Sequence, residues 1–179
     1  MELNDKIYFG EPIQDRFYNG FSDMETVLAR FSNKVGVVKV KDLFLIAKNT
    51  ERMLSKEEDI WIKDIVEEMY VNSYENFDKV ISIIRRRVYE PLIRIEVGKK
   101  VTVVSASHKI IISFDNGEHL IKASNLKVGD KVFVSKDGSG VETAAVTKVM
   151  PEKKQHLHVY GLVTVYGGAF ISGIFQKSY

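Results

Sequence analysis

Short runs of β-branched and aromatic residues follow one another along most of this chain, and they constrain its fold more than any other feature. Turn residues separate the runs, with few amphipathic stretches long enough to form helices. This pattern is typical of an all-β protein and differs from the alternation of strands and helices in an α/β protein. The expected strands cover residues 26–31, 35–40, 79–88, 91–97, 100–105, 108–114, 119–123, 130–134, 141–150, 157–165 and 169–175.

Two turn sequences predict β-hairpins. Asp115-Asn116-Gly117 joins two expected strands, and Asn-Gly tolerates the positive φ angles of a tight hairpin turn. A longer glycine-containing loop over 136–140 joins the strands at 130–134 and 141–150. We therefore expect antiparallel pairing on both sides of these loops.

Helix is expected only in the first half of the chain. Residues 39–49 place apolar side chains on one helical face, and Ser55-Lys56-Glu57-Glu58 is a capping-box pattern that predicts a helix running toward Glu68. The second helix competes with another interpretation, because residues 60–62 and 65–66 also fit strands.

Size and composition indicate one globular domain. The chain has 179 residues, of which 45% are hydrophobic and 28% charged, enough to bury a core. It has three prolines, no cysteine and a net charge of +2. We find no membrane span or export signal and expect a soluble cytoplasmic protein without disulfides or thiolate chemistry. High Ile, Val and Lys usage is compatible with a thermophilic source.

One local cluster of cations is a candidate for binding nucleic acid. Acidic and basic residues are interspersed along the chain, so the whole molecule is not a polycation, and any binding of nucleic acid would come from this local patch. A cluster of this kind without aromatic residues between its members more often forms a solvated face. Its members are Arg85, Arg86, Arg87, Arg94, Lys99 and Lys100.

Three later segments resemble, in order and approximate spacing, the Hint domain family of inteins and Hedgehog autoprocessing domains. They cover 101–114, 123–134 and 159–179. In the second segment Leu126, Gly129 and Asp130 match a family turn, and in the third Gly161 replaces an Asp that often assists the chemistry. The resemblance implies a horseshoe-like β fold, with no insert large enough for a homing endonuclease.

The resemblance also implies a catalytic pair at 105–108. In the family a Thr-x-x-His motif positions the scissile peptide and protonates the departing amide nitrogen. The matching residues here are Ser105 and His108, and serine keeps the hydroxyl group of the family's threonine.

The opening block of the family matches residues 20–31, where Glu25-Thr26 occupies the acidic-Thr positions. This register defines residues 1–20 as an arm or extein-like segment and residues 21–179 as the Hint domain. It places Phe21 on the nucleophile position. A register slipped by one residue would offer Ser22 as the nucleophile and leave intein-type self-processing through Ser22 and His108 as an alternative.

The junction residues predict that splicing has been lost. Acyl shift needs a hydroxyl or thiol, which Phe21 lacks. The family ends in His-Asn, whose amide cyclises to release the chain, whereas Lys177 and Ser178 stand at these positions. With Tyr179 as the last printed residue, we expect no second segment to be ligated, and we expect residues 1–20 to remain attached.

We therefore expect a splicing-inactive Hint domain, without catalytic activity beyond residual self-cleavage, that serves as a binding or structural module. Its partner would be another protein or a larger assembly, with the apolar arm docking in cis or in trans. Nucleic acid is the less favoured partner. We expect no membrane association, cofactor or small-molecule substrate. His156 and His158 share one strand face and, with His119, are the candidate ligands of a zinc site, but no carboxylate or cysteine accompanies them, so we expect no metal.

Overall fold

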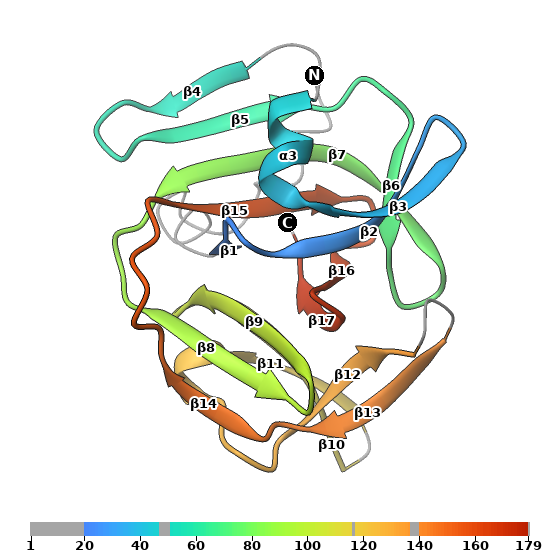
Figure 1. The fold of residues 1–179 in the computed structure, drawn as a ribbon, viewed down its shortest axis with the longest axis vertical. Helices are drawn as coiled ribbons and strands as arrows, with labels where there is room; N and C mark the ends of the chain where they lie inside the picture. The colour runs from blue at the N-terminus through green and yellow to red at the C-terminus, as the bar shows by residue number, and fades with distance from the viewer. Residues whose placement is uncertain (1–19, 47–50, 116, 137–139, 179) are drawn as a thin grey trace.

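The computed structural model describes residues 20–46, 51–115, 117–136 and 140–178. Within these ranges the chain is dominated by antiparallel strands arranged in two sheets, with one α-helix, α3 (Val40–Ile46), packed against the larger sheet (Figure 1). The all-β prediction is confirmed. No helix in the described ranges is long and apolar enough to cross a membrane.

The larger sheet contains eleven strands, in the order β14-β8-β9-β1-β15-β7-β6-β2-β3, with β5 and then β4 added at β7. Its strands are β1 (Phe21–Ser22), β2 (Thr26–Phe31), β3 (Lys34–Lys39), β4 (Glu51–Ser55), β5 (Ile60–Asp64), β6 (Met69–Asn72), β7 (Phe77–Arg87), β8 (Leu92–Val97), β9 (Lys100–Ser105), β14 (Lys148–Pro151) and β15 (His158–Thr164).

The smaller sheet contains six strands, in the order β11-β10-β12-β17-β16, with β13 paired to β12. Its strands are β10 (Lys109–Phe114), β11 (Gly117–Lys122), β12 (Lys131–Ser135), β13 (Val141–Ala145), β16 (Gly168–Ile171) and β17 (Ile174–Lys177). A single 3₁₀ turn, η1 (Ala123–Asn125), follows β11.

One hydrophobic core joins the two sheets. Side chains from the larger sheet, such as Leu162 and Ile95, belong to the same buried cluster as Ile110 and Ile174 of the smaller sheet. All four are fully buried, so each contributes on the order of 2 kcal/mol of apolar burial to stability. The shared core explains why the sequence shows no linker between two halves.

Both predicted hairpins are confirmed. β10 pairs with β11 through the turn at 115–117, where Asp115 has a φ of 44°. β12 pairs with β13 across the 136–140 loop, and Gly140 has a φ of 88° that favours glycine. Asn116 and residues 137–139 lie outside the described ranges.

The helix predicted from Ser55 toward Glu68 is wrong. The Ser55 hydroxyl does accept the predicted hydrogen bond from the Glu58 N–H, at 3.1 Å, but this bond closes the turn of the β4–β5 hairpin. Ile60 and Ile62 are buried and alternate with outward residues, a period of two that pairing with β7 fixes. The first predicted helix is confirmed over 40–46; Lys39 is instead the last residue of β3, and 47–49 lie outside the described ranges.

Two other expected strands are each divided in two. The run at 141–150 forms β13 and β14, which belong to different sheets, and the run at 169–175 turns at Ser172-Gly173 to form β16 and β17. Gly173 has a φ of 81°, so the turn falls where glycine allows it. β6 was not expected at all.

Candidate functional site

Phe21 and His108 meet in the interior, although 87 positions of chain separate them in the sequence. Phe21 lies on β1 between Val104 of β9 and Tyr160 of β15. Its ring is 1% exposed and meets the imidazole edge-on, with centroids 6.1 Å apart and an interplanar angle of 85°. The structure thus brings together the residue at the family's nucleophile position and the histidine of the Ser-x-x-His motif.

The peptide bond before Phe21 is held against the turn that carries His108. The Ser105 N–H donates to the Gly20 carbonyl at 2.8 Å, and the His108 N–H donates to the Ser105 carbonyl at 2.9 Å. A Cβ on Gly20 would lie 2.9 Å from the Tyr160 carbonyl oxygen, closer than a side chain can approach. The Gly20–Phe21 peptide bond is therefore packed closely between the backbone of Ser105 and the backbone of Tyr160.

Ser22 and Ser105 supply buried hydroxyls on the other side of this strand layer. Both side chains are 1% exposed or less, and among the described residues neither oxygen has a hydrogen-bond partner. Successive strand residues point to opposite faces, so Ser22 points away from the face on which Phe21 meets His108. This geometry argues against Ser22 and His108 acting as a reactive pair.

The imidazole of His108 is enclosed and neutral at pH 7. Burial lowers the pKa of His108 from 6.5 to about 4, and the hydrogen bond to Gln176 only partly opposes this. The Nε2 atom lies 3.0 Å from the Gln176 side-chain oxygen. Because a base with this pKa holds few protons at pH 7, His108 is poorly suited to protonate a leaving group there.

Glu25, in the loop between β1 and β2, is the second titratable group of this interior. Burial raises the pKa of Glu25 from 4.5 to about 7, although hydrogen bonds from Ser172, the Val103 N–H and Thr102 oppose the rise. The carboxyl group therefore ties the start of the domain to β9 and to the β16–β17 turn.

Lys177 and Ser178, at the far end of the domain, do not share one environment. Ser178 is buried; its hydroxyl lies 2.6 Å from that of Thr164, and its N–H donates to the Gly167 carbonyl at 2.9 Å. Lys177 is exposed and lies at the edge of a pocket. No described contact joins either residue to Phe21 or His108.

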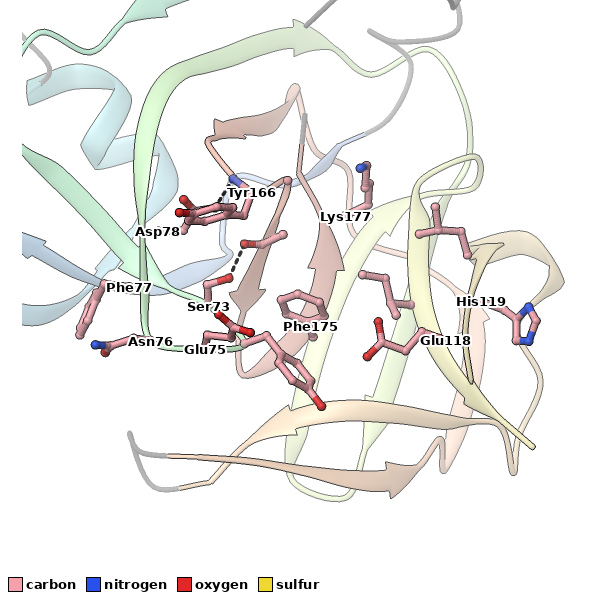
Figure 2. A pocket seen from close by; sticks show the side chains of 15 residues that line it. Ser73, Glu75, Asn76, Phe77, Asp78, Glu118, His119, Tyr166, Phe175 and Lys177 are labelled. Atoms are coloured by element: carbon pink, nitrogen blue, oxygen red, sulfur yellow. Dashed lines mark hydrogen bonds between the residues drawn. The ribbon is translucent and has the colours of Figure 1, made fainter. Parts of the chain in front are cut away.

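This pocket has a volume of about 790 Å³ and lies between the β6–β7 turn, β11 and the end of β17 (Figure 2). Its wall combines aromatic and acidic side chains with one lysine: Tyr74, Phe175, Glu75, Asp78, Glu118 and Lys177. Asp78 is 1% exposed; its Oδ2 accepts the Tyr166 N–H at 2.9 Å, while its Oδ1 has no partner among the described residues.

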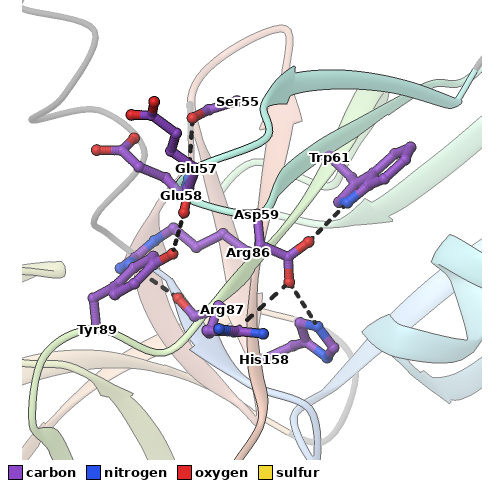
Figure 3. A network of polar contacts seen from close by, with 9 residues as sticks. All are labelled: Ser55, Glu57, Glu58, Asp59, Trp61, Arg86, Arg87, Tyr89 and His158. Atoms are coloured by element: carbon purple, nitrogen blue, oxygen red, sulfur yellow. Dashed lines mark hydrogen bonds and ion pairs between the residues drawn. The ribbon is translucent and has the colours of Figure 1, made fainter.

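The predicted basic cluster is largely engaged with other side chains. Arg85 lies over the rings of Phe44 and Trp61, Arg86 is 1% exposed, and Arg94 pairs with Glu96 at 3.0 Å. Arg87 lies 4.0 Å from Asp59, within the network around that carboxylate (Figure 3). Lys99 and Lys100 lie apart from the arginines at the β8–β9 turn, where the Lys100 stem packs over Gly173.

The three histidines considered as a metal site do not form one. His158 Nε2 lies 3.6 Å from Asp59 (Figure 3). His156 Nδ1 lies 2.8 Å from Asp23, and the ring of His119 packs against Phe114. Each histidine has a different neighbour. Among the described residues, no group of three or more possible ligands could hold a metal ion.

The family turn is formed as the resemblance implies. Leu126 is buried, Gly129 has a φ of 95°, and the Asp130 carboxylate accepts the Lys127 N–H at 2.8 Å. Reciprocal backbone bonds tie this turn to Val146. The turn thus positions β12 against the core independently of any chemistry.

Sequence reasoning missed Gln176 and Thr102, and it quoted Glu25 only as part of a motif. All three are at most 4% exposed, and they form a series of hydrogen bonds that begins at the buried imidazole. A signal for Gln176 existed: it lies two residues after buried Ile174 on one strand, so the strand period places its amide on the inward face.

Comparison with known proteins supports the fold. No protein-family model matches the chain. No curated protein matches it. Among solved structures, an intein from a hyperthermophile superposes with a TM-score of 0.79 at 15% identity, covering 89% of this chain and 99% of that one. A transcription factor IIB Mvu mini-intein superposes with a TM-score of 0.76 at 20% identity, covering 90% of this chain and 99% of that one. The TvoVMA intein superposes with a TM-score of 0.73 at 22% identity, covering 88% of this chain and 96% of that one.

These superpositions extend over nearly the whole described chain and over nearly the whole of each intein. The chain therefore has the Hint fold of the inteins.

Proposed function

We propose that this chain is an intein-type domain that no longer cleaves its own backbone and is retained as a protein-binding module. The observation that supports the loss of cleavage is Phe21, whose ring fills the space beside His108 while the Gly20 carbonyl is held by Ser105. The hydrocarbon ring of Phe21 has no atom that can attack the Gly20 carbonyl.

The chemistry that Phe21 prevents is a transfer of the Gly20 acyl group to a side chain. In that step the thiol or hydroxyl of residue 21 gives up its proton, its sulfur or oxygen bonds to the Gly20 carbonyl carbon, the amide C–N bond breaks, and the nitrogen takes up the proton that was given up. Replacing the ring by a thiol tests whether only the nucleophile is missing. We expect Phe21→Cys to form a thioester that hydroxylamine cleaves, releasing residues 1–20.

Intact-mass spectrometry after incubation with hydroxylamine measures this directly. Phe21→Ala is the matched control, because it removes the ring without adding a nucleophile; it and the unaltered protein should keep their full mass. Cleavage of the unaltered protein would contradict the loss of activity. An uncleaved but folded Phe21→Cys protein would contradict the assignment of residue 21 to the nucleophile position.

The pocket beside Lys177 supports the binding part of the proposal. Its wall carries three carboxylates, Glu75, Asp78 and Glu118, against one lysine, and Tyr74 and Phe175 supply apolar surface. The unpartnered Oδ1 of Asp78 is a buried acceptor, and a buried acceptor without a donor is costly. A basic side chain from a partner polypeptide would supply both a donor and a compensating charge.

Charge reversal at the rim tests this site. Affinity purification from the source organism, with the bound proteins identified by mass spectrometry, should recover a partner with the unaltered chain and lose it with Glu118→Lys. Glu142→Lys is the matched control, because it makes the same charge change on β13, outside the pocket. Equal recovery by both variants, or no partner with the unaltered chain, would contradict the proposal.

A further inference from the structure

A continuous series of hydrogen bonds connects His108 to Glu25 through the interior. His108 Nε2 lies 3.0 Å from Gln176 Oε1, and Gln176 Nε2 lies 2.9 Å from Thr102 Oγ1. Thr102 Oγ1 lies 3.1 Å from Glu25 Oε1. These four residues come from β17, β9, the turn before β10 and the β1–β2 loop, so the series links both ends of the domain.

A backbone carbonyl fixes the direction of every bond in this series. Gln176 has a second contact, at 3.3 Å, with the carbonyl oxygen of Ile171. A carbonyl can only accept, so the amide group of Gln176 must turn its NH₂ toward Ile171 and Thr102. Its oxygen therefore faces His108. Amide orientation, usually ambiguous, is determined here by the network.

The remaining protons then have only one arrangement. The Gln176 oxygen cannot donate, so His108 must carry a hydrogen on Nε2 to bond with it. Thr102 receives the Gln176 N–H and turns its own O–H toward Glu25, whose Oε1 also accepts the Val103 N–H. Since burial keeps the imidazole neutral, Nδ1 is left without a hydrogen.

The protonation state of Glu25 does not reverse the direction of these hydrogen bonds. Its other oxygen, Oε2, is bonded to the Ser172 hydroxyl, and that hydroxyl oxygen also accepts the Thr26 N–H at 3.3 Å. A proton on Glu25 can therefore reside on Oε2 and donate to Ser172. The bonds that Oε1 accepts from Thr102 and Val103 are preserved in both states.

We propose that Gln176, Thr102 and Glu25 are positioning residues that hold His108 as its Nε2–H tautomer, with a bare Nδ1 inside the Hint site. Among the described residues, Nδ1 is buried and has no hydrogen-bond partner. Nδ1 is thus the ring nitrogen that no hydrogen bond occupies, whereas Nε2 is held by Gln176. The inference rests on the proposed identity of this site but not on whether the site reacts.

The tautomer can be measured in the unaltered protein. In protein labelled with ¹⁵N-histidine, a bare imidazole nitrogen and a protonated one differ widely in ¹⁵N chemical shift. We expect the His108 signals, assigned by their loss in His108→Gln, to show hydrogen on Nε2 and none on Nδ1 from pH 5.5 to pH 8. Hydrogen on Nδ1 in the unaltered protein would overturn the proposal.

Two variants then test the positioning residues. Gln176→Leu removes the acceptor while keeping similar volume, and we expect its His108 signals to move toward a mixture of tautomers. Thr102→Val removes one link and should shift the signals less, while Thr102→Ser keeps the hydroxyl and should restore them. Unchanged His108 shifts in folded Gln176→Leu would overturn the role of Gln176, and equal shifts in the valine and serine variants would overturn that of Thr102.

The outcome is separable from that of the proposed function. If Phe21→Cys does not cleave but His108 is the Nε2–H tautomer, the register of the site is wrong and the positioning network stands. If Phe21→Cys cleaves but His108 carries its hydrogen on Nδ1, the proposed function stands and the network is wrong.

Discussion

Glu25 and His108 should impose opposite pH dependences on the free energy of unfolding. Substituting either residue should therefore leave the pH dependence caused by the other one unopposed. The pKa of Glu25 rises from 4.5 to about 7, and that of His108 falls from 6.5 to about 4. Each change of about 2.5 pKa units corresponds to about 3 kcal/mol between the two protonation states. This is a large part of the stability of a typical domain.

The signs follow from which state binds the proton. Glu25 binds it more tightly in the folded state, so its contribution is fully present below pH 4.5 and is lost as the pH rises to about 7. His108 binds it more weakly in the folded state, so its contribution is fully present above pH 6.5 and is lost as the pH falls to about 4. Between pH 4.5 and 6.5 the two slopes nearly cancel.

Glu25→Gln removes the pH dependence that Glu25 contributes to the free energy of unfolding, and it keeps a hydrogen-bonding atom at both carboxylate oxygen positions. Relative to the unaltered protein, its free energy of unfolding should rise by about 3 kcal/mol between pH 4.5 and pH 7.5. His108→Gln should behave in the opposite way, losing about 3 kcal/mol relative to the unaltered protein between pH 4 and pH 6.5. Differences from the unaltered protein cancel the other titrating groups, which all three proteins share.

Urea unfolding at half-unit intervals from pH 4 to pH 8 measures these differences, and equal m-values show that the transitions are comparable. If the free energy of unfolding of Glu25→Gln follows that of the unaltered protein at a constant difference across this pH range, then Glu25 is not a buried carboxyl that binds its proton more tightly in the folded state. Parallel curves for His108→Gln would refute the buried neutral imidazole in the same way.

Two substitutions test the packing of the core, and one binding measurement tests the basic cluster. Gly168→Ala should destabilise the protein by about 1–3 kcal/mol in urea, because its Cβ would lie 2.5 Å from the Phe175 ring; an unchanged midpoint would contradict this packing. Leu162→Ala should cost about 2–5 kcal/mol, since the side chain is fully buried in the shared core, and a cost below about 1 kcal/mol would place it outside that core. Fluorescence anisotropy with a labelled DNA duplex at low salt should show no binding that weakens steeply with salt, because the arginines of the cluster are engaged with acids and rings; such binding would contradict that arrangement.

The local elements could be predicted because short-range physics decides them. β2 and β9 occupy the expected residues without change, and the hairpins at 115–117 and 136–140 form where positive φ angles are tolerated. The failure at 55–68 is equally instructive. There the capping hydrogen bond of Ser55 forms as predicted, but pairing with β7 makes the following residues a strand.

The site was predictable only in part. The sequence order of motifs, through their resemblance to a known family, indicated that residues 21 and 108 share a cleft, and the structure brings their rings together. For the hydrogen-bond network that begins at His108, the sequence offered a signal only for Gln176, whose strand position places it on the inward face. Thr102, on β9, and Glu25, in the β1–β2 loop, carry no local pattern that marks them as members of this network. Their roles depend on three segments that meet only in the folded chain.

The sequence by itself determined a chain of short antiparallel strands, their hairpin turns, and the absence of a nucleophile at residue 21, because backbone preference and side-chain chemistry are properties of single residues and their neighbours. Only the tertiary structure decided which strands pair, where Ser22 points, and which nitrogen of His108 carries the hydrogen. Those outcomes depend on burial and on donors and acceptors brought from distant segments, and desolvation gives such contacts the energy to fix a proton in place.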